Sequence, residues 1–331
     1  MGLTRPAPRR PPPSLPYPGS MPMPPVPPVP PTAPDPDSGP LQPRTAAEGR
    51  IAILTQYFAT DAVNHGDVAS FPPPIALDEL PFAERRRLLD GLLTIRPPRP
   101  IDDEDMRDEL DEMLANESAE RAAEAGDPDA LALPVLATTH GVAGALGEHV
   151  ALWEGDLTTL RAGAIVNAAN GQMLGCRVPG HACIDNVIHA VAGPGLRAEC
   201  AEYMAGRAER GEGPEPVGRA VLTGGYHLPA GHVIHTVGPV VDGGRVEKRH
   251  RTRLASCYRA ILDTAQETGL DSVGLCSVST GAFGYPKEEA APLVLETIGA
   301  WLAAHPGSEL RIVICAFSAK DRAVYEAALA N

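Results

Sequence analysis

Three residues of the types that bind transition metals lie within eight positions of one another: Cys176, His181 and Cys183. Thiolate and imidazole are ligands that Zn²⁺ prefers, and the glycines and the proline between them allow a tight loop. The only further donor nearby is Asp185. The spacing therefore predicts a zinc ion held by three protein ligands with one open position, as is typical of catalytic zinc. A reduced cysteine pair in a glycine-rich turn is the alternative interpretation.

Two asparagines, Asn167 and Asn170, precede this loop at the end of a predicted strand. Their amides offer uncharged donors and acceptors, which suit the hydroxyl groups of a ribose. An asparagine in a left-handed turn before Gly171 would explain one of the two residues without a ligand.

A carboxylate follows an earlier strand in the segment Gly155-Asp156-Leu157. Asp156 could accept a hydrogen bond from an exocyclic amine such as that of adenine. It could equally cap the short turn that follows it.

A third loop follows the strand predicted at 272–277 and runs from Ser279 to Pro286. Its glycines, Gly281 and Gly284, allow backbone N–H groups to converge on an anion such as a diphosphate. The alternative is a tight turn whose aromatic residues, Phe283 and Tyr285, pack in the core.

Strands and helices alternate from about residue 149, which predicts an α/β domain whose sheet is covered on both faces. The carboxyl ends of parallel strands meet at one edge of such a sheet, so the three loops should lie together. The predicted strands are 149–153, 164–168, 219–223, 233–237, 272–277 and 310–317, and the predicted helices are 183–192, 196–208, 248–268, 287–304 and 319–330.

The first 145 residues have a different composition. Residues 1–50 hold 18 of the 36 prolines, which predicts a disordered Pro-rich tail, either solvated or docking on a proline-recognising partner. Residues 51–145 form a predicted helical extension, with helices from Leu77 to the stop at Pro97 and from Ile101 to Leu114, whereas 51–74 are ambiguous. Residues 146–331 then form the main domain.

The net charge of −14 is concentrated in residues 101–129, where 13 acidic residues face two basic ones. A basic footprint for nucleic acid is absent, and no apolar run approaches the ~18 residues of a membrane span. Six cysteines are too few for a disulfide scaffold, so we expect a cytoplasmic protein. His189 and His235 lie in apolar runs and are predicted to be packed histidines. The oligomeric state stays open, with a monomer as the working expectation.

Four segments occur in the order and approximate spacing of the macrodomain family: 155–157, 164–170, 233–239 and 279–286. The loop from Gly175 to Asn186, with its Cys-His-Cys pattern, resembles that of the zinc-dependent protein-ADP-ribose hydrolases of bacteria. Those proteins also carry a helical extension with an Arg-Pro-Pro segment, similar to Arg96-Pro97-Pro98 here. The resemblance covers about residues 78–331.

This resemblance implies a three-layer α/β/α sandwich around a mixed sheet, which binds ADP-ribose at its crest. It implies that Asp156 binds the adenine amine, that Leu157 makes a backbone contact and that Asn170 meets the distal ribose. One zinc ion would lie at Cys176, His181 and Cys183. Asn170 and Asp185 are the candidate catalytic residues, Asp185 either as a general base or as a partner of a metal ligand. The diphosphate would lie against Ser279, Thr280, Gly281, Ala282 and Phe283.

The activity that the resemblance implies is hydrolysis of mono-ADP-ribose from modified protein side chains, with release of ADP-ribose. A non-catalytic ADP-ribose reader with a structural metal is the main alternative. A hydrolase of small ADP-ribose esters is a weaker one, since the helical extension could help to recognise a protein.

Overall fold

The structure, a computed structural model, describes residues 46–68 and 80–330. The chain divides after Pro43, and all of these residues belong to the unit that follows. Most of the predicted tail therefore lies outside the described residues. Helix α1 begins at Ala46, inside the range 1–50 that the proline content assigned to the tail.

A six-stranded mixed sheet forms the centre of the main domain, in the order β1-β6-β5-β2-β4-β3. Every neighbouring pair is parallel except β3 and β4, which are antiparallel at one edge. The strands are β1 (Val150–Glu154), β2 (Ala164–Ala169), β3 (Ala220–Gly224), β4 (His232–Val237), β5 (Ser272–Leu275) and β6 (Arg311–Ala316). All six predicted strands are present, although β5 ends two residues earlier than expected.

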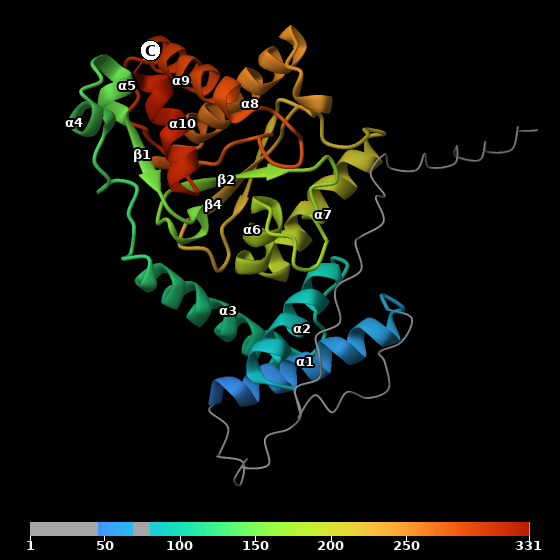
Figure 1. Cartoon of the computed structure of the whole chain (residues 1–331). Coiled ribbons are helices and arrows are strands. Elements are labelled where there is room, and N and C mark those ends of the chain that lie inside the picture. Colours follow the sequence, from blue (N-terminus) through green and yellow to red (C-terminus); the bar gives the residue numbers. More distant parts are fainter. Residues whose placement is uncertain (1–45, 69–79, 331) are drawn as a thin grey trace, which may run out of the picture. The chain divides into compact units, whose positions relative to one another are not determined.

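Helices cover both faces of the sheet, so the predicted three-layer sandwich is confirmed (Figure 1). On one face lie α8 (Lys248–Glu267), α9 (Lys287–Ala304) and α10 (Ala319–Leu329), and on the other α6 (Ile184–Ala192) and α7 (Pro194–Glu209). Two short helices, α4 (Leu136–His140) and α5 (Gly144–His149), lead into β1. The central strands are buried on both faces, which explains why they read as short, continuous apolar runs.

Up to residue 125, the described part of the extension contains the helices α1 (Ala46–Asn64), α2 (Phe82–Ile95) and α3 (Glu104–Glu124). Helix α3 begins after Asp103, whose side chain accepts a hydrogen bond from the Met106 amide, and it continues ten residues beyond the predicted end at Leu114. The three helices share a hydrophobic core that is separate from that of the main domain: Ile51, Leu54, Phe58, Ala59, Ala62, Leu89, Leu92, Leu110, Met113 and Leu114. Both α2 and α3 also contact α6.

Among the described residues, no helix combines the length and the apolar character that crossing a bilayer requires.

Candidate active site

A cavity of about 680 Å³ opens at the carboxyl ends of β1, β2, β5 and β6. Parallel strands bring their following loops to this edge, as the alternating pattern predicts. The cavity is called the cleft below. All twelve predicted site residues line it: Asp156, Leu157, Asn170, Cys176, His181, Cys183, Asp185, Ser279, Thr280, Gly281, Ala282 and Phe283. The structure therefore brings the predicted residues together, whereas their individual roles stay predictions.

Cys176, His181 and Cys183 form a compact donor cluster beside the cleft. The nitrogen and sulfur atoms that could bind a metal all lie within 4.8 Å of one another, and His181 Nδ1 is 3.1 Å from Cys176 Sγ. Burial raises the pKa of the Cys183 thiol to about 11, and the neighbouring Cys176 adds to this rise. A cation at the cluster would reverse this penalty, because metal-bound thiols are deprotonated. Two sulfurs and one imidazole at this separation fit the donor preference of Zn²⁺.

The loop that carries the cluster is shaped by left-handed backbone conformations. Gly175 has φ +81° and Gly180 has φ +72°, as glycine permits. Arg177, which directly follows the first cysteine, adopts φ +56° without being a glycine. Space is also tight at Gly175, because a Cβ atom there would lie 3.1 Å from the ring of His189. Cys183 closes the loop as the N-cap of α6, with its Sγ accepting from the Asn186 amide at 3.4 Å.

Asp185 is held by both asparagines of the β2 end. Asn167 Nδ2 donates to Asp185 Oδ1 at 2.8 Å, and Asn170 Nδ2 donates to Oδ2 at 3.2 Å. Burial raises the pKa of Asp185 to about 6, although these amides and Arg197 oppose the rise. Asn170 Nδ2 also donates to the Gly175 carbonyl at 3.0 Å. The two asparagines therefore differ: Asn167 is fully buried and supports Asp185, whereas Asn170 lines the cleft.

His189 and His235 are buried and do not line the cleft, so the prediction that they are packed histidines is confirmed. Burial lowers the pKa of His235 to about 3 and that of His189 well below its usual value. His235 Nε2 is 3.0 Å from Thr223 Oγ1, and its Nδ1 is 3.1 Å from Asn167 Nδ2. Together with Cys200, the two rings form a second, fully buried donor group.

Asp156 caps the turn that follows it, and its contact with an adenine amine stays a prediction. Its Oδ1 accepts from the Thr158 amide at 2.9 Å, so it caps the short 3₁₀ helix Leu157–Thr159, and it also lines the cleft. Its Oδ2 accepts from Arg121 Nη2 of α3 at 2.7 Å. Arg121 is the one residue of α1–α3 that lines the cleft within the described part of the chain.

The loop after β5 presents its backbone to the cleft. Ser279 adopts φ +67° and turns inward, where a Cβ atom on Gly238 would lie only 2.0 Å from its Oγ. In the described part of the chain, the amides of Gly281, Ala282 and Phe283 donate to no other backbone carbonyl. These unpaired N–H groups suit an anion such as a diphosphate.

The two aromatic residues of this loop lie in different places. Phe283 is half-buried and lines the cleft, whereas Tyr285 is buried in the core. The alternative interpretation, in which the aromatic residues of this loop pack in the core, is therefore correct for Tyr285 and not for Phe283.

Sequence reasoning did not single out several residues that line the cleft, among them the cations Arg121 and Lys287 and the aromatic Phe317. Lys287 begins α9, and its ammonium group pairs with Asp321. Phe317 follows β6 directly and is 77% exposed. The strand-end rule that located the other loops could have found Phe317. Arg121 has only a weak signal, as one of two basic residues in the acidic segment 101–129.

Comparison with known proteins shows that the family model described as Macro domain matches residues 166–294. The chain is similar to a protein-ADP-ribose hydrolase of Staphylococcus aureus, with 37% identity over 247 residues that cover 75% of this chain and 85% of that protein. It is also similar to a protein-ADP-ribose hydrolase of Treponema medium, with 38% identity over 242 residues that cover 73% of this chain and 86% of that protein.

Among solved structures, the chain is similar to a Trypanosoma brucei macrodomain in complex with ADP-ribose. The identity is 38% and the TM-score 0.47, over 56% of this chain and 71% of that one.

Proposed function

The chain belongs to the macrodomain family of protein-ADP-ribose hydrolases, and on this premise we propose that it removes mono-ADP-ribose from modified protein side chains with the help of one zinc ion per chain. The observation that carries the proposal is the position of the Cys176–His181–Cys183 cluster in the same cleft as Asn170 and Asp185. Water adds across the bond between the anomeric carbon of the distal ribose and the acceptor atom. ADP-ribose leaves with the new hydroxyl group, and the side chain takes up a proton.

Zinc is the metal that fits the donor cluster best, because two thiolates and an imidazole are borderline-soft ligands. Among the described residues, no fourth His, Cys, Asp or Glu side chain brings a donor atom within 4.8 Å of all three. A zinc ion bound there would supply a Lewis acid with an open position, which is the arrangement of catalytic zinc sites.

Different residues of the cleft bind different parts of the substrate. Asp156 accepts from the adenine amine through Oδ2, which retains a lone pair besides the one used by Arg121. The amides of Gly281, Ala282 and Phe283, together with the hydroxyls of Ser279 and Thr280, bind the diphosphate, and Leu157 adds a backbone contact. These assignments place the adenine near β1 and the diphosphate near the loop after β5.

Asn170 and Asp185 act at the distal ribose. Both amide hydrogens of Asn170 are already used, by Gly175 O and Asp185, so its contact to a ribose hydroxyl is made through Oδ1. This oxygen accepts from the Gln172 amide at 2.9 Å and keeps a second lone pair for the ribose. Asp185 fixes the Asn170 amide in this orientation. As the carboxylate of the cleft that lies next to the cluster in sequence, it also accepts the proton of the attacking water.

The test uses the purified full-length protein and a mono-ADP-ribosylated carrier protein, with release of ADP-ribose measured by chromatography. We expect turnover in the zinc-loaded protein, loss of turnover after chelation and recovery on addition of Zn²⁺. Asp185→Asn should lower kcat by about 100-fold or more, the usual contribution of a general base. Asp108→Asn, on the exposed part of α3, is the matched control and should leave kcat unchanged.

Three results would argue against the proposal. Binding of ADP-ribose without turnover in zinc-loaded protein would favour a reader. Full turnover of a Cys183→Ala variant would exclude participation of the metal cluster. Release of ADP-ribose from a small ester, but not from the modified carrier, would favour an esterase.

A further inference from the structure

The carboxyl end of α2 presents backbone carbonyls that the helix itself cannot satisfy. The Arg96 amide donates to Leu92 O at 3.0 Å, which is the last bond of the helix. In a continuing helix, the amide of residue 97 would donate to Leu93 O, but residue 97 is proline and has no N–H group. The Arg99 amide, which could serve Ile95 O, donates instead to Pro97 O at 2.8 Å. The Arg-Pro-Pro segment thus leaves carbonyls of Leu93 and Ile95 without a helical donor.

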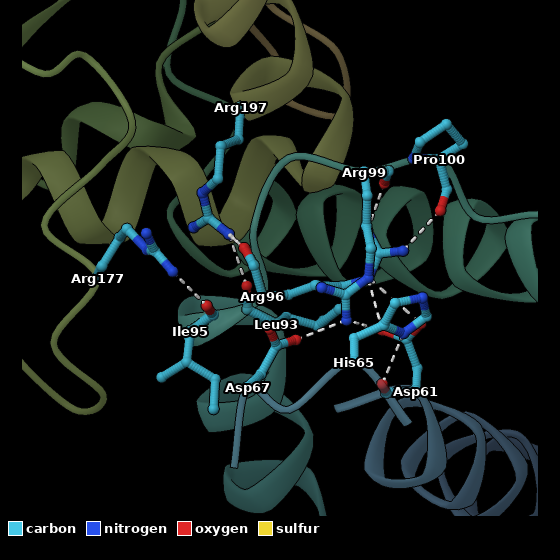
Figure 2. Close-up of polar contacts among 10 residues, drawn as sticks. All are labelled: Asp61, His65, Asp67, Leu93, Ile95, Arg96, Arg99, Pro100, Arg177 and Arg197. Carbon is cyan, nitrogen blue, oxygen red and sulfur yellow. Dashed lines mark hydrogen bonds and ion pairs between the residues drawn. The ribbon is translucent and has the colours of Figure 1, made fainter. Parts of the chain in front are cut away.

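Two arginines of the main domain donate hydrogen bonds to these carbonyls, as Figure 2 shows. Arg197, from α7, donates through Nη1 to Leu93 O at 2.7 Å and to Arg96 O at 3.0 Å. Arg177 donates through Nη2 to Ile95 O at 2.7 Å. Cations at the carboxyl end of a helix are also favoured by the helix dipole.

Both arginines are also part of, or bonded to, the loop that carries the donor cluster. Arg197 donates through Nε to Leu174 O at 3.1 Å, two residues before Cys176. Arg177 directly follows Cys176 and has a left-handed φ of +56°. Such a conformation costs a non-glycine residue energy and persists where its surroundings hold it. The contact of Arg177 with Ile95 O is the hydrogen bond that the structure gives its side chain.

The end of α2 is itself firmly anchored in the extension. Arg96 is only 4% exposed and donates through Nε to Asp61 at 3.0 Å (Figure 2). Its other nitrogens donate to the carbonyls of Arg99 at 2.6 Å and Pro100 at 2.7 Å, and its guanidinium lies 5.7 Å from the centre of the Phe58 ring. The carbonyls that Arg177 and Arg197 contact therefore belong to a rigid support.

We propose that Arg177 and Arg197 are positioning residues. They hold the loop that carries the donor cluster (residues 174–183, called the metal loop) against the end of α2, so that the helical extension determines the ligand geometry and the affinity for the bound metal. This inference rests on the proposed zinc site. It assigns the extension a function besides recognition of a modified protein. It also explains physically why a Pro-Pro segment follows α2, because these prolines free the carbonyls that the two arginines bind.

The experiment measures zinc affinity in the full-length protein by competition with a chromogenic chelator. Groups that orient metal ligands typically contribute 10- to 100-fold to metal affinity. Arg177 is exposed, so we expect Arg177→Ala to weaken zinc binding by about 10-fold, with Arg177→Lys restoring part of the loss because lysine also donates to a carbonyl. Arg197 is buried, and Arg197→Lys, which keeps the charge but loses the forked contact, should have a similar effect.

Arg161→Ala is the matched control. Arg161 also joins the extension region to the main domain, since its Nε lies 3.1 Å from Asp129 Oδ2, but it precedes β2 and so lies at the opposite edge of the sheet from the cleft. Its loss should leave zinc affinity unchanged. Loading each variant with Co²⁺ provides a second measurement, because the visible spectrum of the bound ion reports ligand geometry. We expect a changed spectrum for Arg177→Ala and a wild-type spectrum for Arg161→Ala.

The outcomes separate this inference from the proposed function. If the wild-type protein binds no zinc, the proposed metal site is wrong. If the wild-type protein binds zinc and Arg177→Ala and Arg197→Lys bind it equally well with an unchanged Co²⁺ spectrum, the positioning role is wrong and the metal site stands. A loss of affinity shared by Arg161→Ala would indicate general destabilisation and would also overturn the inference.

Discussion

Arg121 of α3 donates to Asp156 Oδ2 at 2.7 Å, so a helix of the extension reaches the carboxylate that follows β1. The same guanidinium donates to Thr158 Oγ1 at 2.9 Å. The extension thus contacts the cleft at the proposed adenine end through Arg121, and the end of α2 binds Arg177 and Arg197 beside the Cys176–Cys183 loop. Residues outside the α/β domain therefore contact two separate parts of the proposed substrate site.

The first prediction concerns the relative importance of these two residues. Arg121 is 38% exposed, and exposed ion pairs contribute about 0.2–1 kcal/mol, so Arg121→Ala should raise the Kd for ADP-ribose less than about 5-fold. Hydrogen bonds to charged groups contribute about 1.5–3 kcal/mol, so Asp156→Ala should raise it about 10-fold or more. Isothermal titration calorimetry would measure both constants.

Ribose 5-phosphate is the control ligand for this prediction, because it lacks the adenine. Its affinity should be the same for Asp156→Ala and the wild-type protein. Equal losses for both ligands would show that Asp156 does not bind the base, and a larger effect of Arg121→Ala would show that Arg121 contacts the nucleotide itself.

The second prediction concerns the stability that zinc confers. A ligand that binds only the folded state stabilises it by RT ln(1 + [L]/Kd), which is about 4 kcal/mol at 1,000 times Kd. Added Zn²⁺ should therefore raise Tm in the wild-type protein by several degrees, as measured by calorimetry, and Cys183→Ala should abolish this rise.

Cys257→Ala is the matched control for Cys183→Ala. Cys257 is fully buried in α8, far along the chain from the donor cluster. Its loss should lower Tm through the cavity it leaves, while the zinc-dependent rise persists. A rise that survives in Cys183→Ala would place the metal elsewhere.

Much of the main domain could be predicted from sequence, because its apolar strands and helices alternate and the strand-end rule brings Asp156, Asn170 and Ser279 together. The sequence pattern leaves 51–74 ambiguous, because the apolar residues of α1, among them Leu54 and Phe58, pack in the described structure against the other helices of the extension. Local patterns contain no information on such partners.

The contacts of the extension with the site were not predicted for the same reason. The bonds of Arg121 and Arg197 join segments that lie 35 or more residues apart. The acceptors of Arg197 and Arg177 are backbone carbonyls, which carry no side-chain signal at all. The Arg-Pro-Pro segment predicts the end of a helix. Which residues donate to the carbonyls at that end is determined by the tertiary packing, which the sequence pattern does not contain.

The third prediction compares Gly238, which packs against the loop after β5, with Gly281, which lies within that loop. A Cβ atom on Gly238 would lie 2.0 Å from Ser279 Oγ and 2.7 Å from Val278 Cγ1, so Gly238→Ala must displace the loop. Overpacking of this kind costs about 1–3 kcal/mol, and we expect both lower stability in urea and weaker binding of ADP-ribose.

Gly281→Ala provides the contrast. Gly281 lines the cleft, but nothing lies within 4 Å of a Cβ atom built there. This substitution should leave the free energy of unfolding within about 0.5 kcal/mol of wild type and still weaken ADP-ribose binding, because the new methyl group faces the proposed diphosphate. Unchanged binding in Gly281→Ala would argue against a diphosphate at this loop.

The fourth prediction concerns Phe317, whose side chain is 77% exposed although it is aromatic. The register of the sheet pairs Ala316 of β6 with Glu154 of β1, and the Gly155 amide donates to Ala316 O at 3.0 Å. Phe317 thus follows β6 at the level of Gly155, one residue before Asp156. An exposed aromatic ring at the proposed adenine end provides a surface on which the base can stack.

Removal of this ring should weaken the binding of ADP-ribose without changing the stability of the protein. Base stacking on an aromatic residue contributes about 1–3 kcal/mol, so Phe317→Ala should raise the Kd for ADP-ribose at least about 5-fold and leave that for ribose 5-phosphate unchanged. Its free energy of unfolding should stay within about 0.5 kcal/mol of wild type, because the ring is exposed. Phe82→Ala removes another exposed phenylalanine, outside the cleft, and should change neither quantity. Wild-type affinity in Phe317→Ala would mean that the adenine does not lie against β6.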